Sequence, residues 1–202
     1  MKQFFASALA FVAVQAVDPN CTISLSDDED STVSVYYDAA ADQVVFDANI
    51  KDGSFAGFGW GASMQDTEMV IFSANGDSSA LETYYGIGTV TPELDHDMLE
   101  CYDWSVTNNG DKVNFLARRS LECDVHDKTG GSYVVQLDTE LDLISSWNPN
   151  KSTLSYHGKH KIEFKQTFKS DGTCAGVANK DDAIFSNDLT NWMLSQFGQL
   201  IQ

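Results

Sequence analysis

The chain has 202 residues, which fits one β-sandwich or barrel domain or at most two small ones. Hydrophobic residues make up 43% and there are only 3 Pro, so a packed core is expected and a disordered or collagen-like chain is excluded. The 30 acidic residues against 12 Lys and Arg give a net charge of -18, which repels phosphate backbones and anionic lipid surfaces. Nucleic acid is therefore not an expected partner, whereas neutral sugars, basic proteins, cations and buried cofactors remain open.

Residues 1–16 have the pattern of a secretory signal peptide. Lys2 is followed by an apolar run from Phe4 to Val14 and then by Val14-Gln15-Ala16, a small-residue cleavage pattern. The run is shorter than the ~20 residues that span a bilayer, and no later stretch is apolar enough for a membrane helix. We therefore expect a soluble, secreted protein that has no membrane span.

Four cysteines follow the expected cleavage site: Cys21, Cys101, Cys123 and Cys174. An even number of cysteines in an exported chain favours disulfides over free thiols, and they can pair in three ways. We favour Cys101 with Cys123, because they flank an expected hairpin, and Cys21 with Cys174, because this bond would tie the two ends together. The acceptor triplets that begin at Asn20 and Asn150 predict N-glycosylation, although such triplets also arise by chance.

Most of the remaining chain has the composition and alternation of β-strands. The segments 32–37 and 43–50 are rich in Val, Tyr and Phe and are separated by a turn-like segment, which predicts a hairpin. Further strands are predicted at 54–60, 67–73, 80–85, 101–107, 112–119, 132–144 and 161–168. Turn residues such as Asn75-Gly76-Asp77 separate them. This spacing predicts one all-β domain over residues 17–170, an antiparallel sandwich of about 8–10 strands.

The C-terminal extension, residues 171–202, has a different pattern. Its apolar residues recur at helical spacing and predict a short α-helix. They are Leu189, Trp192, Met193, Phe197, Leu200 and Ile201. Such an apolar stripe would either cover an open end of the sandwich or dock onto another subunit.

Common catalytic motifs are absent from the sequence. It contains no G-x-S-x-G, no H-E-x-x-H, no phosphate-binding G-x-x-x-x-G-K and no C-x-x-C, the usual signatures of hydrolases, zinc proteases and nucleotide-binding proteins. The absence of C-x-x-C-H also excludes ordinary covalent attachment of haem. Acidic residues are so numerous that a carboxylate pair carries no information, and we do not propose a glycosidase.

The most distinctive segment is a glycine-interleaved aromatic strand that leads into a loop bearing Met64. Residues 53–72 read GSFAGFGWGASMQDTEMVIF. The glycines remove side chains from one sheet face, which lets a flat ligand or a second sheet approach the backbone. This segment resembles the DOMON family, the β-sandwich domains related to the N-terminal part of dopamine β-monooxygenase and to the cytochrome domain of cellobiose dehydrogenase. The resemblance covers roughly residues 20–170 and continues through the segments 83–95, 103–106, 115–119, 123–125 and 154–158.

The resemblance implies a non-covalent haem b. In haem-binding members of the family, a methionine after the glycine-aromatic strand and a histidine near the final strand hold the iron from both sides. Met64 matches the first position and His157 matches the second. His160 competes with His157, because a short irregular approach to a strand can change which side chain faces inward. The aromatic residues Phe58, Trp60, Tyr84 and Tyr85 could line a haem crevice or stack on sugar rings, and we expect Phe58, Trp60 and Tyr85 to contact the cofactor.

Two classes of function follow. If Met64 and His157 fill both axial positions, oxygen and peroxide have no open site, so the resemblance implies electron transfer rather than catalysis. The expected protein is a secreted cytochrome that relays single electrons to a redox partner or between copies of itself. The alternative is a haem-free carbohydrate-binding or interaction module, whose aromatic rings would stack on sugars. A sugar-binding module has no need of the Met64 and His157 pair, so this pair discriminates between the two.

Overall fold

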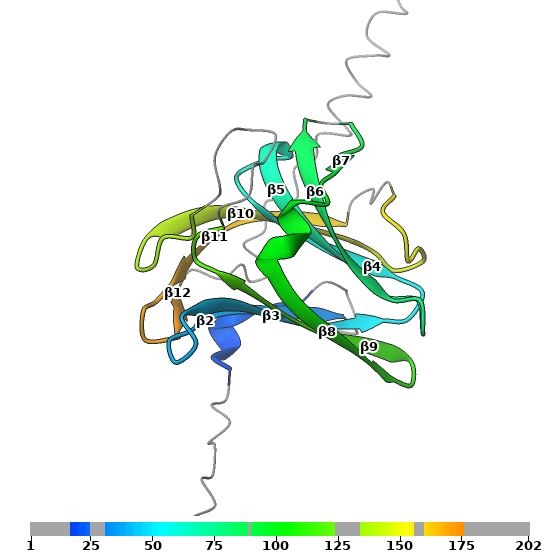
Figure 1. Ribbon diagram of the computed structural model, residues 1–202, viewed down its shortest axis with the longest axis horizontal. Helices are drawn as coiled ribbons and strands as arrows, with labels where there is room; N and C mark the ends of the chain where they lie inside the picture. The colour runs from blue at the N-terminus through cyan, green and yellow to red at the C-terminus, as the bar shows by residue number, and fades with distance from the viewer. Residues whose placement is uncertain (1–16, 25–30, 89, 124–133, 156–159, 176–202) are drawn as a thin grey trace, which may run out of the picture.

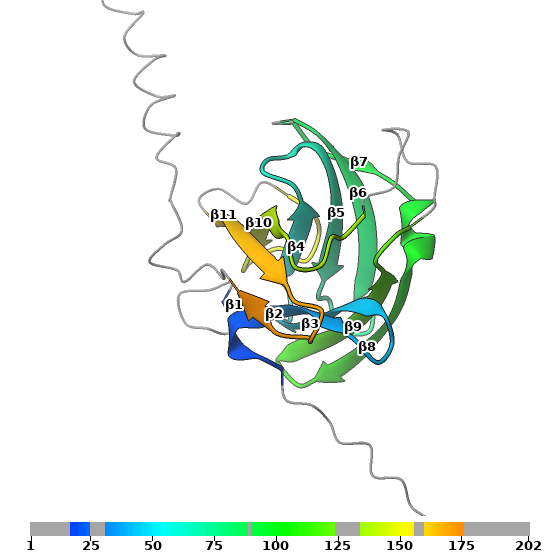
Figure 2. The same cartoon turned by 90° about the vertical axis from the view of Figure 1, so that its left-hand side faces the viewer.

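The computed structural model describes residues 17–24, 31–88, 90–123, 134–155 and 160–175. Within these residues the chain forms two antiparallel sheets that pack face to face, as Figures 1 and 2 show. They contain twelve strands and two short 3-10 helices, η1 (Pro19–Cys21) and η2 (Met98–Cys101). The predicted antiparallel β-sandwich is confirmed, although it has more strands than the expected 8–10.

The sheets have five and seven strands. In order across the first sheet lie β1 (Thr22–Ser24), β2 (Thr32–Asp38), β3 (Gln43–Lys51), β9 (Lys112–Ser120) and β8 (Tyr102–Asn109). In order across the second lie β12 (Cys174–Ala175), β11 (Lys161–Phe168), β10 (Glu140–Asn148), β4 (Phe55–Trp60), β5 (Gln65–Ser73), β6 (Ala80–Ile87) and β7 (Glu93–Leu94). The glycine-aromatic segment is therefore the central strand, β4, of the larger sheet.

The expected strands differ from the observed ones mainly around β10. This strand begins at Glu140 rather than at residue 132, after a turn in which Asp138 has a left-handed backbone with φ of 57°. It continues through Ser145 and Ser146, whose small polar side chains obscure the alternation in the sequence. The strands β1, β7 and β12 have only two or three residues and are too short to produce a periodic pattern.

The predicted C-terminal helix lies outside the described residues. The extension was expected to begin at residue 171, but Cys174 and Ala175 form β12, which pairs with β11. The sandwich therefore continues as far as Ala175.

The core lies between the sheets and is centred on Phe46. Its ring centroid is 5.3 Å from Phe58, 5.8 Å from Trp60, 6.1 Å from Phe72 and 6.0 Å from Tyr102. The contacts with Phe58 and Trp60 are edge-to-face, a geometry that adds about 0.5–1.5 kcal/mol beyond the burial of area. This aromatic cluster fixes the inner face of β4 against the other sheet.

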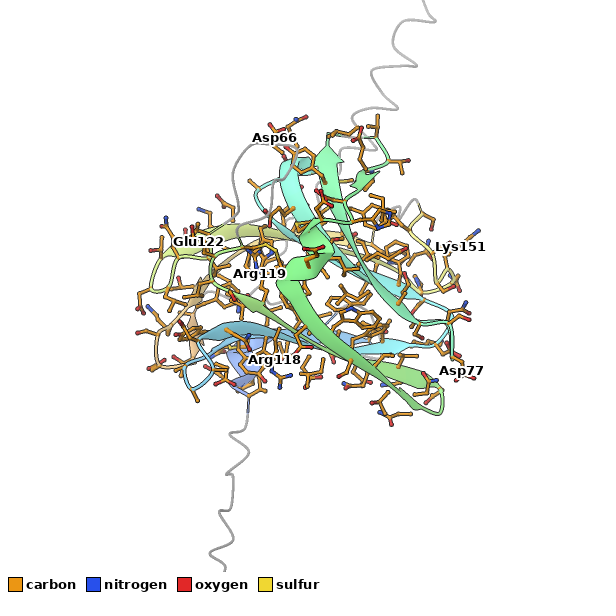
Figure 3. All side chains as sticks on the ribbon, in the orientation of Figure 1. Asp66, Asp77, Arg118, Arg119, Glu122 and Lys151 are labelled. Carbon is orange, nitrogen blue, oxygen red and sulfur yellow. A yellow bond between two sulfur atoms is a disulfide. The ribbon has the colours of Figure 1, made fainter. Side chains whose placement is uncertain are left out.

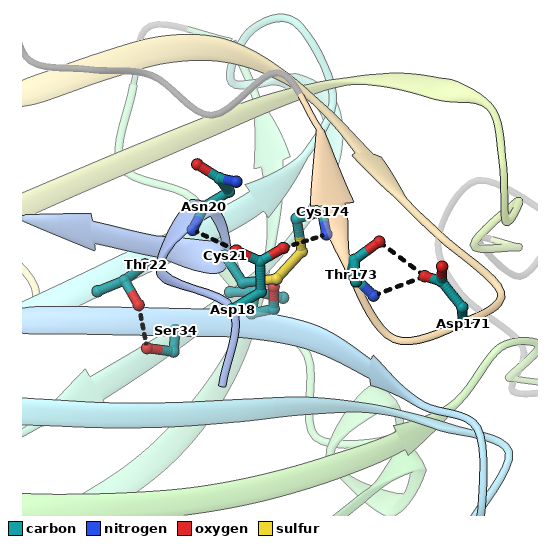
Figure 4. The surroundings of a disulfide bond; sticks show 9 residues. Asp18, Asn20, Cys21, Thr22, Ser34, Asp171, Thr173 and Cys174 are labelled. Atoms are coloured by element: carbon teal, nitrogen blue, oxygen red, sulfur yellow. Dashed lines mark hydrogen bonds between the residues drawn. A yellow bond between two sulfur atoms is a disulfide. The ribbon is translucent and has the colours of Figure 1, made fainter. Parts of the chain in front are cut away.

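Both predicted disulfides are confirmed. Cys21 is bonded to Cys174 and Cys101 to Cys123. The first bond joins η1 to β12, across 153 residues of sequence. Figure 4 shows Asp18 beside this bond, where its carboxylate accepts a hydrogen bond of 3.2 Å from the backbone N–H of Cys174. The disulfide and this hydrogen bond together attach the start of the described chain to its last strand.

Candidate functional site

The central strand β4 has two different faces. Phe58 and Trp60 point into the sandwich core, whereas Gly57 and Gly59 occupy the outer face. Every residue of β4 is buried, because β10 and β5 flank it on both sides. We call Gly57, Gly59 and the following Gly61 the glycine face.

Because the glycine face has no side chains, side chains of the neighbouring strands pack directly against the backbone of β4. A Cβ atom on Gly57 would lie 2.7 Å from Cδ1 of Ile71 on β5. A Cβ atom on Gly59 would lie 2.8 Å from Cγ1 of Ile144 on β10 and 2.9 Å from Cγ2 of Thr67 on β5. These methyl and methylene groups form a low apolar floor above β4. A floor of this kind has the chemistry that a flat apolar ligand requires.

The loop that carries Met64 is fixed by hydrogen bonds at one end of the glycine face. The carbonyl oxygen of Met64 accepts a hydrogen bond of 3.0 Å from the backbone N–H of Gly88. The hydroxyl of Thr67 donates to the carbonyl oxygen of Ser63, and the backbone N–H of Gln65 donates to Oγ of Ser63 at 3.1 Å. The side chain of Met64 is half-buried. The backbone of the loop that carries the Met64 thioether is therefore fixed at the surface.

Close contact with Gly86 gives a first prediction. A Cβ atom on Gly86 would lie 2.2 Å from the carbonyl oxygen of Met64, so Gly86→Ala should push the loop away. We expect the free energy of unfolding to fall by about 1–3 kcal/mol, measured by urea denaturation. Gly57→Ala is the matched control, because its Cβ would meet the end of the Ile71 side chain, which can rotate. Equal losses in the two variants would contradict this reading of the Met64 loop.

The aromatic residues expected around a haem lie on the other face of the sheet. Phe58 and Trp60 are 1% and 2% exposed and belong to the core. Tyr85 pairs with Glu68 on the side that faces the core, and its hydroxyl donates a hydrogen bond of 2.8 Å to Oδ1 of Asp66. The structure thus separates these three rings from the glycine face. Their contact with a cofactor stays a prediction.

His160 lies at the opposite end of β4 from the Met64 loop. Its carbonyl oxygen accepts a hydrogen bond of 3.0 Å from the backbone N–H of Trp147, and the two rings are 5.5 Å apart. Trp147 pairs with Ala56, which precedes the last residue of β4 by four positions, or about 13 Å of strand. The structure therefore does not bring His160 and Met64 together.

His157 lies in the connection between β10 and β11, outside the described residues. This connection leaves the sheet where β10 ends opposite Phe55, whereas the Met64 loop follows the other end of β4. Figure 3 shows the two regions apart, with Asp66 next to the Met64 loop and Lys151 in the β10–β11 connection. The two predicted ligands therefore belong to loops at the two ends of the glycine strand.

A buried ion pair was not recognised from the sequence. Nη1 of Arg119, on β9, lies 3.3 Å from Oε2 of Glu68, on β5, and the two side chains are 1% and 5% exposed. The guanidinium lies 5.4 Å from the Trp60 ring and 6.0 Å from the Tyr102 ring. Burial raises the pKa of the Tyr102 hydroxyl. Figure 3 shows Arg119 between the sheets and the neighbouring Arg118 outside them, so the pair links one sheet to the other.

The part of the chain that the structure describes has neither a cluster of metal ligands nor a membrane-spanning helix. No group of three or more His, Cys, Asp or Glu residues is arranged to hold a metal ion there. Over the same residues, no helix is long and apolar enough to cross a membrane. Asn20 and Asn150 are both exposed, and their glycosylation stays a prediction.

Comparison with known proteins gives a match in fold but none in sequence. No family model and no curated protein matches the chain. The cytochrome domain of Myriococcum thermophilum cellobiose dehydrogenase matches with a TM-score of 0.56 and 14% identity, over 85% of this chain and 87% of that one. The cytochrome b domain of pyranose dehydrogenase from Coprinopsis cinerea matches with a TM-score of 0.51 and 12% identity, over 70% of this chain and 78% of that one. The two-sheet sandwich of this protein is therefore the fold found in these cytochrome domains.

Proposed function

We propose that this protein is a haem b-binding electron-transfer protein in which Met64 and His157 are the axial ligands. The observation that carries the proposal is the fixed Met64 loop at the end of the glycine face, in a fold shared with cytochrome domains. Thioether and imidazole are neutral donors that suit low-spin iron. Haem held by such a pair supplies reversible one-electron transfer.

The residues around Met64 fit this role. Hydrogen bonds to Gly88 and within the loop fix the backbone from which the Met64 side chain projects. Ile144 is half-buried and presents an apolar group over β4, which suits the face of a porphyrin, whereas Ile71 beside it is 2% exposed and is already covered. The donor set and the apolar floor are therefore consistent with a haem site on the outer side of the larger sheet.

We favour His157 over His160 as the second ligand. His160 packs beside Trp147, on the side of the sheet opposite to the glycine face. His157 precedes it by three residues, a stretch that spans at most about 10–11 Å. This reach allows His157 to occupy a different side of the sheet from His160.

The alternative function, a haem-free carbohydrate-binding module, has less support. Sugar rings stack on exposed aromatic faces. Phe58, Trp60 and Tyr85 are 1%, 2% and 5% exposed, so of the four candidate rings only the half-buried Tyr84 is accessible for stacking. The alternative remains an outcome of the experiment below.

The proposal is tested by absorption spectroscopy of the purified protein supplied with haem. We expect a six-coordinate, low-spin spectrum in both oxidation states, because two protein ligands fill the axial positions. Carbon monoxide added to the reduced protein should bind slowly or not at all, because it must first displace a ligand. Rapid, stoichiometric binding would show an open coordination site and would contradict electron relay. Failure to take up haem would exclude the cofactor and favour the alternative module.

The net charge predicts how a redox partner is recognised. With a charge of -18, the protein should attract a basic patch on its partner, and a secreted partner fits the predicted signal peptide. The rate of reduction by such a partner should fall between about 10 mM and about 1 M salt, over which the Debye length falls from about 30 Å to about 3 Å. Stopped-flow reduction by a basic and by a neutral electron donor measures this. Equal salt dependence with both donors would contradict electrostatic recognition.

A further inference from the structure

One sheet edge differs from the other three in the described part of the chain. The edge strands β1, β12 and β7 have three, two and two residues, whereas the edge strand β8 has eight. Short edge strands are a common means by which proteins prevent pairing with another chain. The length of β8 leaves this edge without that protection.

The sequence and pairing of β8 also favour contact with another strand. It pairs with β9 without a bulge over its whole length, and residues 105–109 are exposed. Asp103 is its single charged residue, in a chain of net charge -18. Trp104, Val106 and Thr107 belong to the residue types that favour strands, and Val106 is 39% exposed. Asp77, in the β5–β6 connection, accepts a hydrogen bond of 3.0 Å from the side chain of Asn108. This edge is therefore long and regular, and Asp103 and Asp77 are the acidic groups beside it.

The β8–β9 hairpin determines which backbone groups face the free edge. Its loop consists of Gly110 and Asp111, and Gly110 has φ of 74°, as a two-residue type II′ turn requires. In such a hairpin the pair that closes the loop, Asn109 with Lys112, is hydrogen-bonded, and every second pair then is not. By this alternation, four residues direct their backbone groups away from β9, but the N–H of the first, Tyr102, bonds to the carbonyl oxygen of Leu99 in η2. The three that direct both N–H and C=O to the free edge are Trp104, Val106 and Asn108.

We propose that β8 is a self-association edge, at which two copies of this chain pair antiparallel about a two-fold axis at Val106. In this register Val106 lies opposite Val106 of the second copy, and Trp104 lies opposite Asn108 of the second copy. All three outward-facing residues then form hydrogen-bonded pairs, and the two five-stranded sheets become one continuous sheet. Because Asp103 lies opposite Asn109 of the second copy, the two Asp103 side chains are at opposite ends of the pairing.

Self-association and binding to a basic redox partner should depend on salt in opposite directions. Each copy carries a net charge of -18, so the copies repel one another at low salt. Salt screens this repulsion, and self-association should strengthen as ionic strength rises. Binding to a basic partner should weaken over the same range. The opposite dependence allows the edge to be tested independently of haem.

A cysteine pair tests the register directly. In the proposed dimer the two Val106 Cα atoms are about 5.5 Å apart, within the range of about 4.4–6.8 Å that a disulfide bridges. Val106→Cys should therefore form a disulfide-linked dimer under mild oxidation, seen on non-reducing gels. Thr107→Cys is the matched control, because its side chain lies on the other face, opposite Ser105 of the second copy. Crosslinking of both variants, or of neither, would overturn the proposed register.

Sedimentation velocity tests the association without a new cysteine. We expect the full chain to form more dimer at about 1 M salt than at about 10 mM. Val106→Lys should abolish the dimer, because it places two ammonium groups against each other at the axis. Val106→Thr keeps a neutral β-branched residue and should retain the dimer. A full chain that is monomeric in both salts, or a dimer that persists in Val106→Lys, would overturn the proposal.

Discussion

Arg119→Met is expected to lower the free energy of unfolding by about 3–5 kcal/mol, because it removes the guanidinium that lies 3.3 Å from the buried carboxylate of Glu68. Both side chains are almost fully removed from solvent, and water cannot replace the lost interaction. The variant also loses the contact of the guanidinium with the ring of Trp60. Urea denaturation followed by tryptophan fluorescence measures the effect.

The neighbouring arginine gives the matched control. Arg118→Met makes the same chemical change on the outer face of β9, where the side chain is only half-buried, and should cost less than about 1 kcal/mol. The double variant Glu68→Met, Arg119→Met removes both charges together and should recover much of the stability lost in Arg119→Met. Similar losses in Arg118→Met and Arg119→Met would contradict a specific role for the buried pair.

Strand periodicity predicted most of the sandwich because local alternation reports burial directly. The segment 161–168 shows this, since its predicted bounds are those of β11. The alternation of apolar and polar residues did not predict strand bounds correctly where turns, small polar residues or pairing with a neighbouring strand determined them. β10 begins later in the chain than predicted, because a left-handed turn at Asp138 precedes it. In its second half, the small polar side chains of Ser145 and Ser146 interrupt the alternation of apolar and polar residues. The strands of two or three residues form because a long neighbour accepts them, which no local pattern records.

In the sequence, Arg119 is a charged residue at a position of β9 where the alternation of apolar and polar residues calls for an apolar one. Val113, Phe115 and Ala117 occupy alternate positions on the inner face of β9, and Arg119 is the next residue in that series. An arginine at an inward position requires an acidic partner inside the sandwich. Its identity could not be read from the sequence, because the pairing of Glu68 with Arg119 depends on how the two sheets face each other.

The resemblance located the Met64 loop, but it did not predict which faces the aromatic rings occupy. Phe58 and Trp60 alternate with the glycines along β4, so a ligand on the glycine face lies across the sheet from both rings. Parity along the strand could have revealed this, because residues two apart share a face. The position of His157 relative to Met64 depends on the path of a connection between strands, and alternation carries no information about it.

Met64→Ala should convert the six-coordinate, low-spin haem spectrum to a five-coordinate or high-spin one, because it removes one of the two proposed ligands while leaving the hydrogen-bonded backbone of the loop in place. Met98→Leu is the control: Met98 is 1% exposed in the core between the sheets, away from the glycine face, and leucine replaces it with nearly equal volume, so the spectrum should not change. His157→Ala should have the same effect as Met64→Ala, whereas His160→Ala should retain the wild-type spectrum, since its ring packs beside Trp147.

The reverse result for the two histidines would make His160 the ligand and would require β11 to begin differently from the structure. Unchanged six-coordinate spectra in Met64→Ala and in the double variant His157→Ala, His160→Ala would exclude this haem site.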